Sequence, residues 1–473
     1  MSGVQFGTSG ARGLVSSMSD EVCYAYAQAF LRAVAPGTGT VVLGHDLRPS
    51  SPAIAAACAR AVRDAGKQVL FVGALPTPAI AYYAAVQGAP AIVVTGSHIP
   101  FDRNGIKFYR ADGEISKQDE QAMLDAEVET ATQDTAFAAA PLLAVTGEPA
   151  QAYLQRYLKV FGAQVLAGMH IAIYEHSSVA RDILRTILEA LGATVLALGR
   201  TDEFVPIDTE AVRAEDIERA ARWAQEHTFD AIVSTDGDAD RPLIGDEQGR
   251  WLRGDIVGIL CSQYLAADYV VTPVSSNTAV EGCGKFKEVI RTRIGSPYVI
   301  AGMEQAAAAH GPHVVVAGYE ANGGFLLGSD IECNGAVLKA LPTRDAVLPI
   351  VAVLALACGR GCRVSEVACD LPPRFTASDR LQNFATDLSR DLIVRLAQEP
   401  AQAGLLLAPQ SGRPAHVDTT DGLRVTFTNG DIVHLRPSGN APELRCYAEA
   451  SSQEIAEVLC QSCLGRIAET AHT

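Results

Sequence analysis

Apolar and polar positions alternate in blocks along the chain, and three of these blocks follow the same plan. Residues 41–73 run from an apolar stretch through a polar loop, HDLRPSS, and an alanine-rich stretch of helical spacing to a second apolar stretch. Residues 171–199 repeat this order, and residues 269–295 repeat it in a shorter form. Each block predicts a strand, a loop, a helix and a second strand. Three copies at domain-sized separation predict three similar α/β domains, each with a mixed sheet flanked by helices.

The pattern changes after Cys362. A helix is expected from about Asp379, and two alternating stretches follow it, separated by the dipeptide Asn429-Gly430. Asn-Gly between alternating stretches is a strong hairpin signal, so we expect a separate C-terminal α+β domain. The predicted domains span residues 1–145, 146–255, 256–365 and 366–473.

Composition narrows the class of protein. The chain has 473 residues, of which 48% are apolar and 19% charged, as in a compact globular protein of three or four domains. Its net charge of −16 opposes general attraction to nucleic acid or to an anionic membrane. Any anionic ligand therefore needs a local group of arginine and lysine side chains.

Several features favour a cytoplasmic location. The start, MSGVQFGTSGARG, has no basic segment followed by an apolar one, so no secretory signal is expected. The longest apolar stretch, around residues 346–358, is too short to cross a bilayer. The eleven cysteines are scattered and odd in number, which favours reduced thiols over a disulfide framework.

Three aspartates follow an apolar strand in the sequence FDAIVSTDGDADRPLIGDEQG. In extended backbone, alternate side chains project to one side, so Asp236, Asp238 and Asp240 can converge on one cation. An EF-hand is disfavoured although Glu247 stands at its twelfth position, because Arg241 replaces the turn glycine and a strand precedes the loop. The motif predicts a divalent-metal site, best suited to Mg²⁺, with a solvated acidic turn as the alternative.

A second motif follows the buried-type strand APAIVV. The strand ends at Thr95 and leaves Gly96, Ser97 and His98 at its carboxyl end, where ligand sites of open α/β sheets lie. The sequence is not G-x-S-x-G, so the nucleophile elbow of α/β-hydrolases is disfavoured. Together with the metal site, Ser97 is a candidate phosphoryl carrier, and Lys107 would neutralise charge. The alternative is a loop whose hydroxyl only caps a turn.

The third motif is LRPSGNAPELR, near the C-terminus. Arg436 offers a planar fork of donors, Ser438 and Asn440 offer side-chain donors, and Gly439 allows close approach of an anion. Arg445 adds a second guanidinium. This motif predicts a phosphate-binding loop, with a plain hairpin turn as the alternative.

The fourth motif, FGTSGARG, lies near the N-terminus. Ser9, Gly10 and Arg12 would make a similar polar, glycine-rich loop, and a disordered tail is the alternative. Neither a P-loop nor a strand-anchored G-x-G-x-x-G occurs, so a nucleotide cofactor is not expected.

The four loops and their order resemble those of the α-D-phosphohexomutase superfamily over essentially the whole chain. The resemblance implies four domains around a deep central cleft, with a mobile last domain. It further implies that the TGSHIP loop carries a phosphoserine, that DGDADR binds Mg²⁺, that GYEANGGF contacts the sugar and that RPSGNA binds the substrate phosphate. The expected catalytic residues are Ser97, His98, Lys107, Arg12 and Arg241. The expected substrate contacts are Ser9, Glu320, Asn322, Arg436, Ser438, Gly439, Asn440 and Arg445, and the expected metal ligands are phosphorylated Ser97, Asp236, Asp238 and Asp240.

Four residues depart from the usual pattern of that superfamily. Ile99 stands where an asparagine usually follows Ser-His. Asn322 and Gly324 replace the commoner serine and histidine of the sugar loop, which bears on sugar discrimination rather than on chemistry. Ser296 stands where some members carry a histidine, so the resemblance assigns no general base.

The resemblance also implies a reaction. Phosphorylated Ser97 donates its phosphoryl group to a hexose 1-phosphate, the resulting 1,6-bisphosphate turns end for end, and the other phosphate returns to Ser97. Mg²⁺ and Lys107 would stabilise the transferring oxygens. The general base stays unassigned, with His98 and Lys107 as the candidates. A hexose 1,6-bisphosphate is expected as the activator.

The resemblance implies mannose 6-phosphate and mannose 1-phosphate as the favoured substrate pair, in the supply of GDP-mannose. The phosphates of glucose or glucosamine are alternatives. A metal-dependent phosphatase or a non-catalytic sugar-phosphate binder is the alternative from another class, and a phosphatase would release inorganic phosphate steadily. The expected partner is a small sugar phosphate, with no nucleic acid and no membrane, and the protein is expected as a monomer or homodimer.

Overall fold

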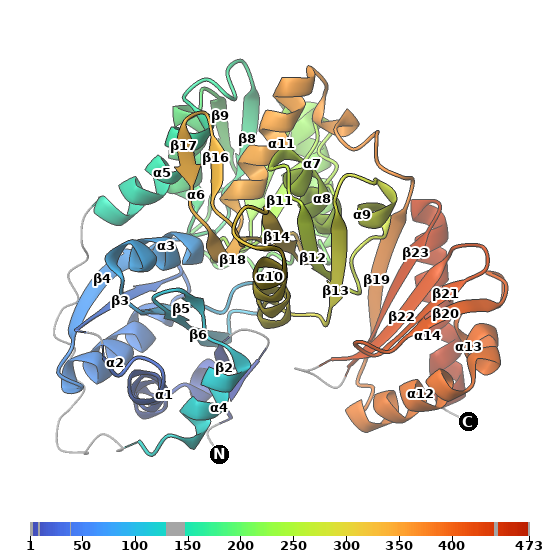
Figure 1. Ribbon diagram of the computed structural model, residues 1–473, viewed down its shortest axis with the longest axis horizontal. Helices are drawn as coiled ribbons and strands as arrows, with labels where there is room; N and C mark the ends of the chain where they lie inside the picture. Colours follow the sequence, from blue (N-terminus) through green and yellow to red (C-terminus); the bar gives the residue numbers. More distant parts are fainter. Residues whose placement is uncertain (1–2, 8–9, 38, 129–146, 439–442, 472–473) are drawn as a thin grey trace.

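Four units of secondary structure follow one another along the chain in the computed structural model, which describes residues 3–7, 10–37, 39–128, 147–438 and 443–471. The first unit, in blue, and the last, in red, lie on opposite sides of the molecule, with the third, in olive, between them (Figure 1). None of the helices in these ranges is long and apolar enough to cross a membrane.

The first unit is a seven-stranded sheet with helices packed on it. Its strands are β1 Gln5–Phe6, β2 Ala11–Leu14, β3 Thr40–His45, β4 Gln68–Ala74, β5 Ala91–Val94, β6 Arg103–Arg110 and β7 Gly113–Glu114. Its helices are α1 Asp20–Ala33, α2 Ser51–Asp64, α3 Thr77–Gln87 and α4 Lys117–Asp125, with a short 3-10 turn at Val15–Ser17. The strand order is β1-β2-β6-β5-β3-β4, and β7 pairs with β6.

The second and third units repeat the central part of this sheet. The second unit contains α5 Glu148–Phe161, β8 His170–Tyr174, α6 Arg181–Ala190, β9 Thr194–Leu198, α7 Ala214–Glu226, β10 Ala231–Thr235 and β11 Pro242–Gly245. The third contains α8 Gly254–Tyr264, β12 Tyr269–Pro273, α9 Ala279–Gly282, β13 Glu288–Thr292, α10 Ser296–His310, β14 Val316–Tyr319 and β15 Phe325–Leu327. It continues with β16 Ile331–Cys333, β17 Ala336–Leu338, β18 Leu341–Asp345, α11 Val347–Arg360 and a 3-10 turn at Val364–Glu366.

All three units share one strand order. The sheets read β6-β5-β3-β4, β11-β10-β8-β9 and β15-β14-β12-β13. In each sheet three strands are parallel, and the last one in sequence runs antiparallel to its neighbour. The prediction of three similar α/β domains with mixed sheets is confirmed. The predicted boundary between residues 255 and 256 lies in the first turn of α8.

The C-terminal unit is an antiparallel sheet with the order β19-β23-β22-β21-β20. Its strands are β19 Phe375–Gln382, β20 Pro414–Asp418, β21 Leu423–Phe427, β22 Ile432–Pro437 and β23 Glu443–Ala450, and its helices are α12 Thr386–Gln398, α13 Pro400–Leu407 and α14 Gln453–Ala471. Asn429-Gly430 joins β21 to its antiparallel neighbour β22, so the predicted hairpin is confirmed. The helix predicted from about Asp379 is present as α12, but it begins only at Thr386, because Asp379 lies in β19, which pairs with β23.

The second and third units share one hydrophobic core. Ile171 and Val233 of the second sheet belong to the same buried cluster as Val257 of α8 and Ile350 of α11. Because close-packed interiors resist deformation, these two units form a continuous support for the loops at their sheet edges.

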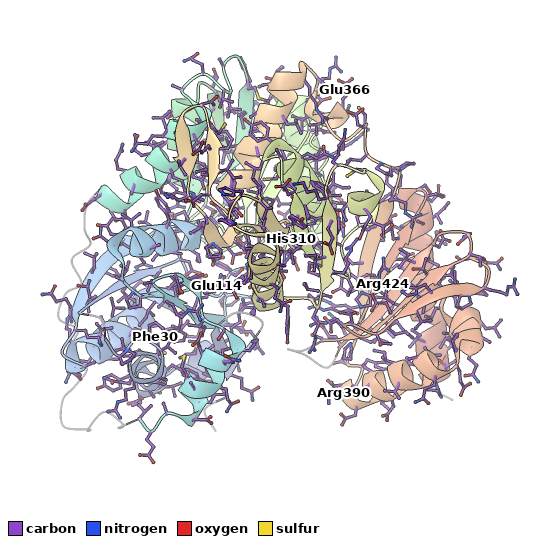
Figure 2. All side chains as sticks on the ribbon, viewed as in Figure 1. Phe30, Glu114, His310, Glu366, Arg390 and Arg424 are labelled. Atoms are coloured by element: carbon purple, nitrogen blue, oxygen red, sulfur yellow. The ribbon has the colours of Figure 1, made fainter. Side chains whose placement is uncertain are left out.

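Contacts between the other units are more polar. Glu114 on β7, labelled in Figure 2, accepts hydrogen bonds from Ser296 (3.1 Å) and Thr343 (2.9 Å) of the third unit. Glu449 of β23 accepts the backbone N–H of Thr278 at 3.0 Å and pairs with Arg374 at 2.6 Å. Polar contacts of this kind are typical of units that move relative to one another.

All eleven cysteines are free thiols. Cys460 and Cys463 have the C-x-x-C spacing, but both lie buried in α14 rather than at an exposed redox site. Reduced thiols therefore stay a prediction that agrees with this arrangement.

Candidate active site

Three of the loops singled out in the sequence occupy the same place in the three repeats. Residues 95–102 join β5 to β6, residues 236–241 join β10 to β11, and residues 320–324 join β14 to β15. In each case the chain leaves the carboxyl end of a parallel strand and turns back into an antiparallel one. Ligand sites of open α/β sheets lie at this edge, and the packing of the three units brings the loops together there.

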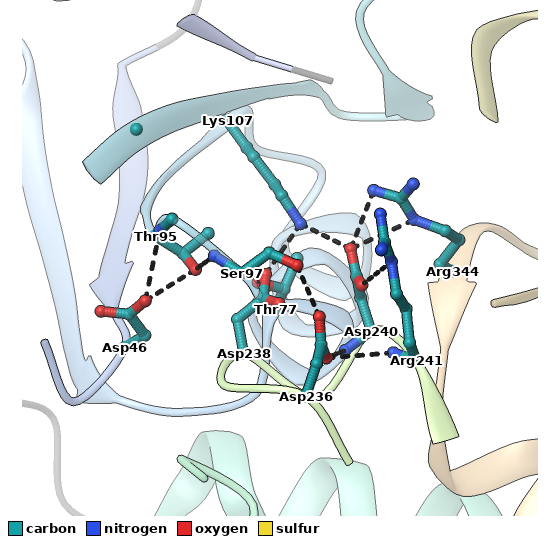
Figure 3. A network of polar contacts seen from close by, with 12 residues as sticks. Asp46, Thr77, Thr95, Ser97, Lys107, Asp236, Asp238, Asp240, Arg241 and Arg344 are labelled. Atoms are coloured by element: carbon teal, nitrogen blue, oxygen red, sulfur yellow. Dashed lines mark hydrogen bonds and ion pairs between the residues drawn. The ribbon is translucent and has the colours of Figure 1, made fainter. Parts of the chain in front are cut away.

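The three aspartates of the second loop form a compact cluster. Asp236, Asp238 and Asp240 each offer a carboxylate oxygen within 4.8 Å of the others (Figure 3). The three carboxylates converge because the chain makes a tight turn, in which Ala239 has a φ of 60°. The spacing had suggested extended backbone instead. Asp236 Oδ1 closes this turn by accepting the backbone N–H groups of Asp240 and Arg241, each at 3.2 Å.

The cluster is suited to a divalent cation. Asp238 Oδ1 and Asp240 Oδ1 are buried and have no hydrogen-bond partner among the described residues. Burial, reinforced by the other two carboxylates, raises the pKa of Asp236 well above its ordinary value. Buried oxygens without partners are costly, and carboxylate oxygens are the ligands that Mg²⁺ prefers. A bound Mg²⁺ would satisfy both oxygens and relieve the repulsion.

Ser97 faces this cluster. Its hydroxyl donates a hydrogen bond to Asp236 Oδ2 at 2.5 Å, and its backbone N–H donates to Thr95 Oγ1 at 2.9 Å. The residue is fully buried and has a φ of 53°, a left-handed conformation that is uncommon outside glycine. Such a conformation persists only where the surroundings hold it, and it often marks a functional site.

Arg48 holds the Ser97 loop, although the sequence analysis did not identify it. Its guanidinium donates hydrogen bonds to four backbone carbonyls of this loop, pairs with Asp46 at 3.3 Å, and lies 4.1 Å from the ring centroid of Phe204. The four carbonyls belong to Ser97, Ile99, Pro100 and Arg103, at 2.5–2.9 Å. The signal that could have identified Arg48 was its place in the polar HDLRPSS loop, at the end of a buried strand.

Lys107 on β6 lies between two of the aspartates. Its ammonium donates to Asp238 at 2.7 Å and to Asp240 at 2.5 Å. Burial alone would lower the pKa of Lys107, but the attraction of Asp238 and Asp240 outweighs burial and raises it. The side chain is therefore a fixed positive charge. Thr77, also missed from the sequence, donates to Asp238 Oδ2 at 2.6 Å.

His98 is held as a neutral imidazole. Burial, together with the neighbouring charges of Arg241 and Arg12, lowers its pKa well below 6.5. Its Nδ1 lies 3.0 Å from the Arg241 guanidinium and 3.3 Å from the Ser97 hydroxyl. Because the guanidinium can only donate, Nδ1 carries the lone pair.

Arg12 lies on β2. The prediction that it belongs to a polar, glycine-rich loop is therefore wrong. It stands opposite Gly105 of β6, in the antiparallel pairing of these two strands. Burial, with Arg241 and Arg344 nearby, lowers the pKa of Arg12 to about 10. The side chain therefore adds positive charge beside the aspartate cluster. Ser9 lies outside the described residues.

The sugar loop of the third unit joins the same network through Arg344. The Arg344 guanidinium donates to Glu320 Oε2 at 3.0 Å and to Asp240 Oδ2 at 3.1 Å. Asn322 turns back on its own loop, since its Oδ1 accepts the backbone N–H of Gly324 at 2.9 Å. The sequence analysis also did not identify Arg344. The only signal for it was the tripeptide Thr-Arg-Asp at the end of a strand.

The described residues of the predicted phosphate-binding motif lie at the ends of β22 and β23 in the C-terminal sheet. Arg436 and Arg445 are directly opposite each other on β22 and β23, so both point to one face of the sheet. Arg436 pairs with Asp421 at 3.0 Å, and Asp421 also accepts the backbone N–H of Ile294 at 2.9 Å. Ser438 is buried. Gly439 and Asn440 lie outside the described residues.

The chain matches family models along most of its length. Residues 3–135, 151–249 and 253–375 match the models described as phosphoglucomutase/phosphomannomutase, alpha/beta/alpha domains I, II and III. Residues 390–464 match the phosphoglucomutase/phosphomannomutase C-terminal domain.

Curated relatives and a solved structure agree with these matches. The chain is 48% identical over 470 residues to a phosphomannomutase of Salmonella muenchen, covering 98% of this chain and 96% of the relative. It is 46% identical over 471 residues to a phosphomannomutase of Sinorhizobium fredii, covering 97% of each. Its fold is similar to the crystal structure of a putative phosphomannomutase from Thermus thermophilus, with a TM-score of 0.76, 22% identity, and coverage of 100% of this chain and 99% of the other.

Proposed function

The chain belongs to the phosphoglucomutase/phosphomannomutase family, and we propose that it interconverts mannose 6-phosphate and mannose 1-phosphate. It is thus an isomerase that moves a phosphoryl group within a sugar phosphate. One observation carries the proposal: the Ser97 hydroxyl lies 2.5 Å from Asp236, within a buried cluster of three aspartates and a lysine. Mannose is favoured because the two relatives that share nearly half of its residues are phosphomannomutases.

In the proposed reaction, phosphorylated Ser97 is the phosphoryl donor. A sugar hydroxyl attacks the phosphorus, the bond from phosphorus to Ser97 Oγ breaks, and a hexose 1,6-bisphosphate forms. After the bisphosphate turns end for end, Ser97 Oγ attacks the other phosphate, which leaves the product and restores the phosphoserine. Hexose 1,6-bisphosphate is therefore both intermediate and activator.

The residues around Ser97 support different parts of this reaction. Neutral His98 is better suited than Lys107 to accept the proton of the attacking hydroxyl, because Lys107 is held as an ammonium. Lys107, Arg12 and Arg241 supply positive charge where the phosphoryl oxygens gather negative charge.

Asp236, Asp238 and Asp240 would hold Mg²⁺, together with an oxygen of phosphorylated Ser97. When bound, Mg²⁺ supplies Lewis-acid stabilisation to the transferring phosphoryl group. Two buried carboxylate oxygens, Asp238 Oδ1 and Asp240 Oδ1, accept no hydrogen bond among the described residues, which supports this assignment.

The remote phosphate and the sugar would be held by the other two loops. Arg436, Ser438 and Arg445 on the C-terminal sheet, with Gly439 and Asn440, would bind the phosphate that is not reacting. Glu320 and Asn322 would contact the sugar hydroxyls. The two ends of the site lie on different units, so closure of the C-terminal unit on the substrate would complete it.

We also propose that the protein works in the cytosol, which the eleven free thiols support. We propose that it acts as a monomer or a homodimer.

A substrate comparison tests the proposed function. The 1-phosphates of mannose, glucose and glucosamine are supplied separately with Mg²⁺ and a trace of hexose 1,6-bisphosphate, and the 6-phosphates are measured by ³¹P NMR. Mannose 1-phosphate is expected to turn over fastest, with little inorganic phosphate released because the site excludes water. Faster turnover of glucose or glucosamine phosphate would reassign the substrate, and steady phosphate release would make the protein a phosphatase.

A further inference from the structure

Arg344 connects two carboxylates that belong to different units. It lies at the end of β18 and is almost fully buried, with 1% of its surface exposed. Its Nη1 donates to Glu320 Oε2 at 3.0 Å in the sugar loop. Its Nε and Nη2 approach Asp240 Oδ2 of the second unit at 3.1 and 2.8 Å. One guanidinium therefore spans the sugar loop and the aspartate cluster, which Figure 3 shows in part.

The orientation of both carboxylates follows from this bridge. On Asp240, Arg344 and Lys107 occupy Oδ2, while Oδ1 is buried, accepts no hydrogen bond among the described residues and lies 3.5 Å from Arg241 Nε. On Glu320, the contact with Oε2 leaves Oε1 without a contact from Arg344. A planar guanidinium fixes carboxylates in direction as well as in charge, whereas an ammonium is a compact charge whose donors rotate.

Gly324 makes the bridge possible. A Cβ at this position would lie 2.6 Å from Arg344 Cδ and 2.9 Å from Cγ, closer than real Cβ contacts allow. The backbone of Gly324 does not have a positive φ, so the glycine is not required by the turn. The space that a side chain would fill is used by the aliphatic part of Arg344.

We propose that Arg344 is a positioning residue that aims Glu320 at a sugar hydroxyl while tying the sugar loop to Asp240, and that Gly324 provides its path. This proposal rests on the proposed function for its substrate, a hexose phosphate. Arg344 acts through Glu320 and does not itself hold the phosphate. Binding of the sugar is thereby linked to the loop that faces Ser97.

Steady-state kinetics separate this role from a role in charge balance. The variant Arg344→Lys keeps the positive charge but removes the planar fork of donors that orients both carboxylates. It is expected to raise the KM for mannose 1-phosphate at least tenfold, with a smaller change in kcat. Glu320→Gln should raise the KM similarly, and the double variant should raise it by less than threefold more, because both changes remove the same interaction. A KM of Arg344→Lys within threefold of the parent, or fully multiplicative effects, would overturn the proposal.

Binding without turnover provides a second readout. Mannose 1-phosphate and inorganic phosphate are titrated by calorimetry into Ser97→Ala and into the same protein carrying Arg344→Lys. Mannose 1-phosphate is expected to bind at least tenfold more weakly to the second protein, and inorganic phosphate equally to both. An equal loss for inorganic phosphate would show that Arg344 holds phosphate directly and would contradict the positioning role.

Thermal unfolding tests the proposal that Gly324 makes room for the Arg344 side chain, and this measurement needs no substrate. Gly324→Ala should lower the melting temperature in the parent, and should lower it much less in an Arg344→Ala background, where the side chain that it displaces is gone. Equal losses in both backgrounds would refute the role of Gly324. If glucosamine 1-phosphate rather than mannose 1-phosphate binds to Ser97→Ala, the proposed substrate fails, and the binding comparison then tests Arg344 with that sugar.

Discussion

The hydroxyl of Ser97 donates a hydrogen bond to Asp236 at 2.5 Å, although 139 residues separate them in sequence. The two residues occupy equivalent turns of two repeated units, each at the carboxyl edge of its sheet. A nucleophile from one unit and a cation site from the next therefore meet at the contact between units.

Removing the hydroxyl should abolish the reaction. Ser97→Ala is expected to lower kcat by at least 10³-fold, since it removes the hydroxyl that is proposed to carry the phosphoryl group. Mass spectrometry should locate phosphate on Ser97 in the active parent. Ser462→Ala, at an exposed position of α14, is the matched control and should retain full activity. Active enzyme without phosphate on Ser97 would contradict the proposed reaction.

Removing one metal ligand should weaken cation binding. Asp238→Asn replaces one buried oxygen that has no described partner, so we expect Mg²⁺ or Mn²⁺ to bind at least about 10²-fold more weakly. Calorimetry with Mg²⁺, or the EPR signal of bound Mn²⁺, measures this. Asp391→Asn, on the exposed face of α12, should bind the cation like the parent. Unchanged affinity in Asp238→Asn would place the cation elsewhere.

Arg48 should stabilise the Ser97 loop. Arg48→Met leaves four carbonyls and the buried Asp46 without their partner, so a loss of about 3–5 kcal/mol in unfolding free energy is expected. Arg60→Met removes a partly exposed pair with Asp64 and should cost less than about 1 kcal/mol. Urea unfolding compares the two variants, and similar losses would show that Arg48 is not an anchor.

The close approach of the two loops should depend on Gly237. An added Cβ would lie 2.9 Å from the carbonyl oxygen of Ser97, so Gly237→Ala should push the loops apart and lower kcat at least tenfold. Gly465→Ala, in α14, meets nothing within 4 Å and should stabilise the protein by about 0.5–1 kcal/mol. Parent-like kcat in Gly237→Ala would mean that the spacing of these loops is not critical.

The C-terminal unit should lose stability at acid pH through His434. Burial lowers the pKa of His434 from 6.5 to about 4. The unfolded chain therefore binds the proton more tightly than the folded unit, and protonation favours unfolding as the pH falls from 6.5 towards 4. The full effect is about 3 kcal/mol, and it is absent above pH 6.5.

Amide hydrogen exchange of β22, corrected for the intrinsic pH dependence, measures this loss of protection between pH 7 and pH 5. His434→Gln should flatten the change. Protection that is equal at both pH values in the parent would show that His434 does not titrate in this way.

Local patterns predicted a large part of this protein. The repeated blocks at residues 41–73, 171–199 and 269–295 predicted three similar units because periodicity and turn signals act over short stretches. The Asn429-Gly430 hairpin was predicted for the same reason. The start of the helix expected from about Asp379 was wrong, because Asp379 lies in a strand that pairs with β23, more than sixty residues away, and no local pattern records that pairing.

Local patterns likewise identified some residues of the site and not others. Ser97 and the three aspartates stand in dense local motifs, so the sequence alone identified them as candidates. Arg344 and Arg48 stand singly in ordinary stretches, and their importance lies in contacts with residues 104 and 49 positions away. Tertiary packing alone decided that the equivalent turns of three units meet, and that one buried guanidinium bridges two of them, because distances between separate units depend on how their cores pack together.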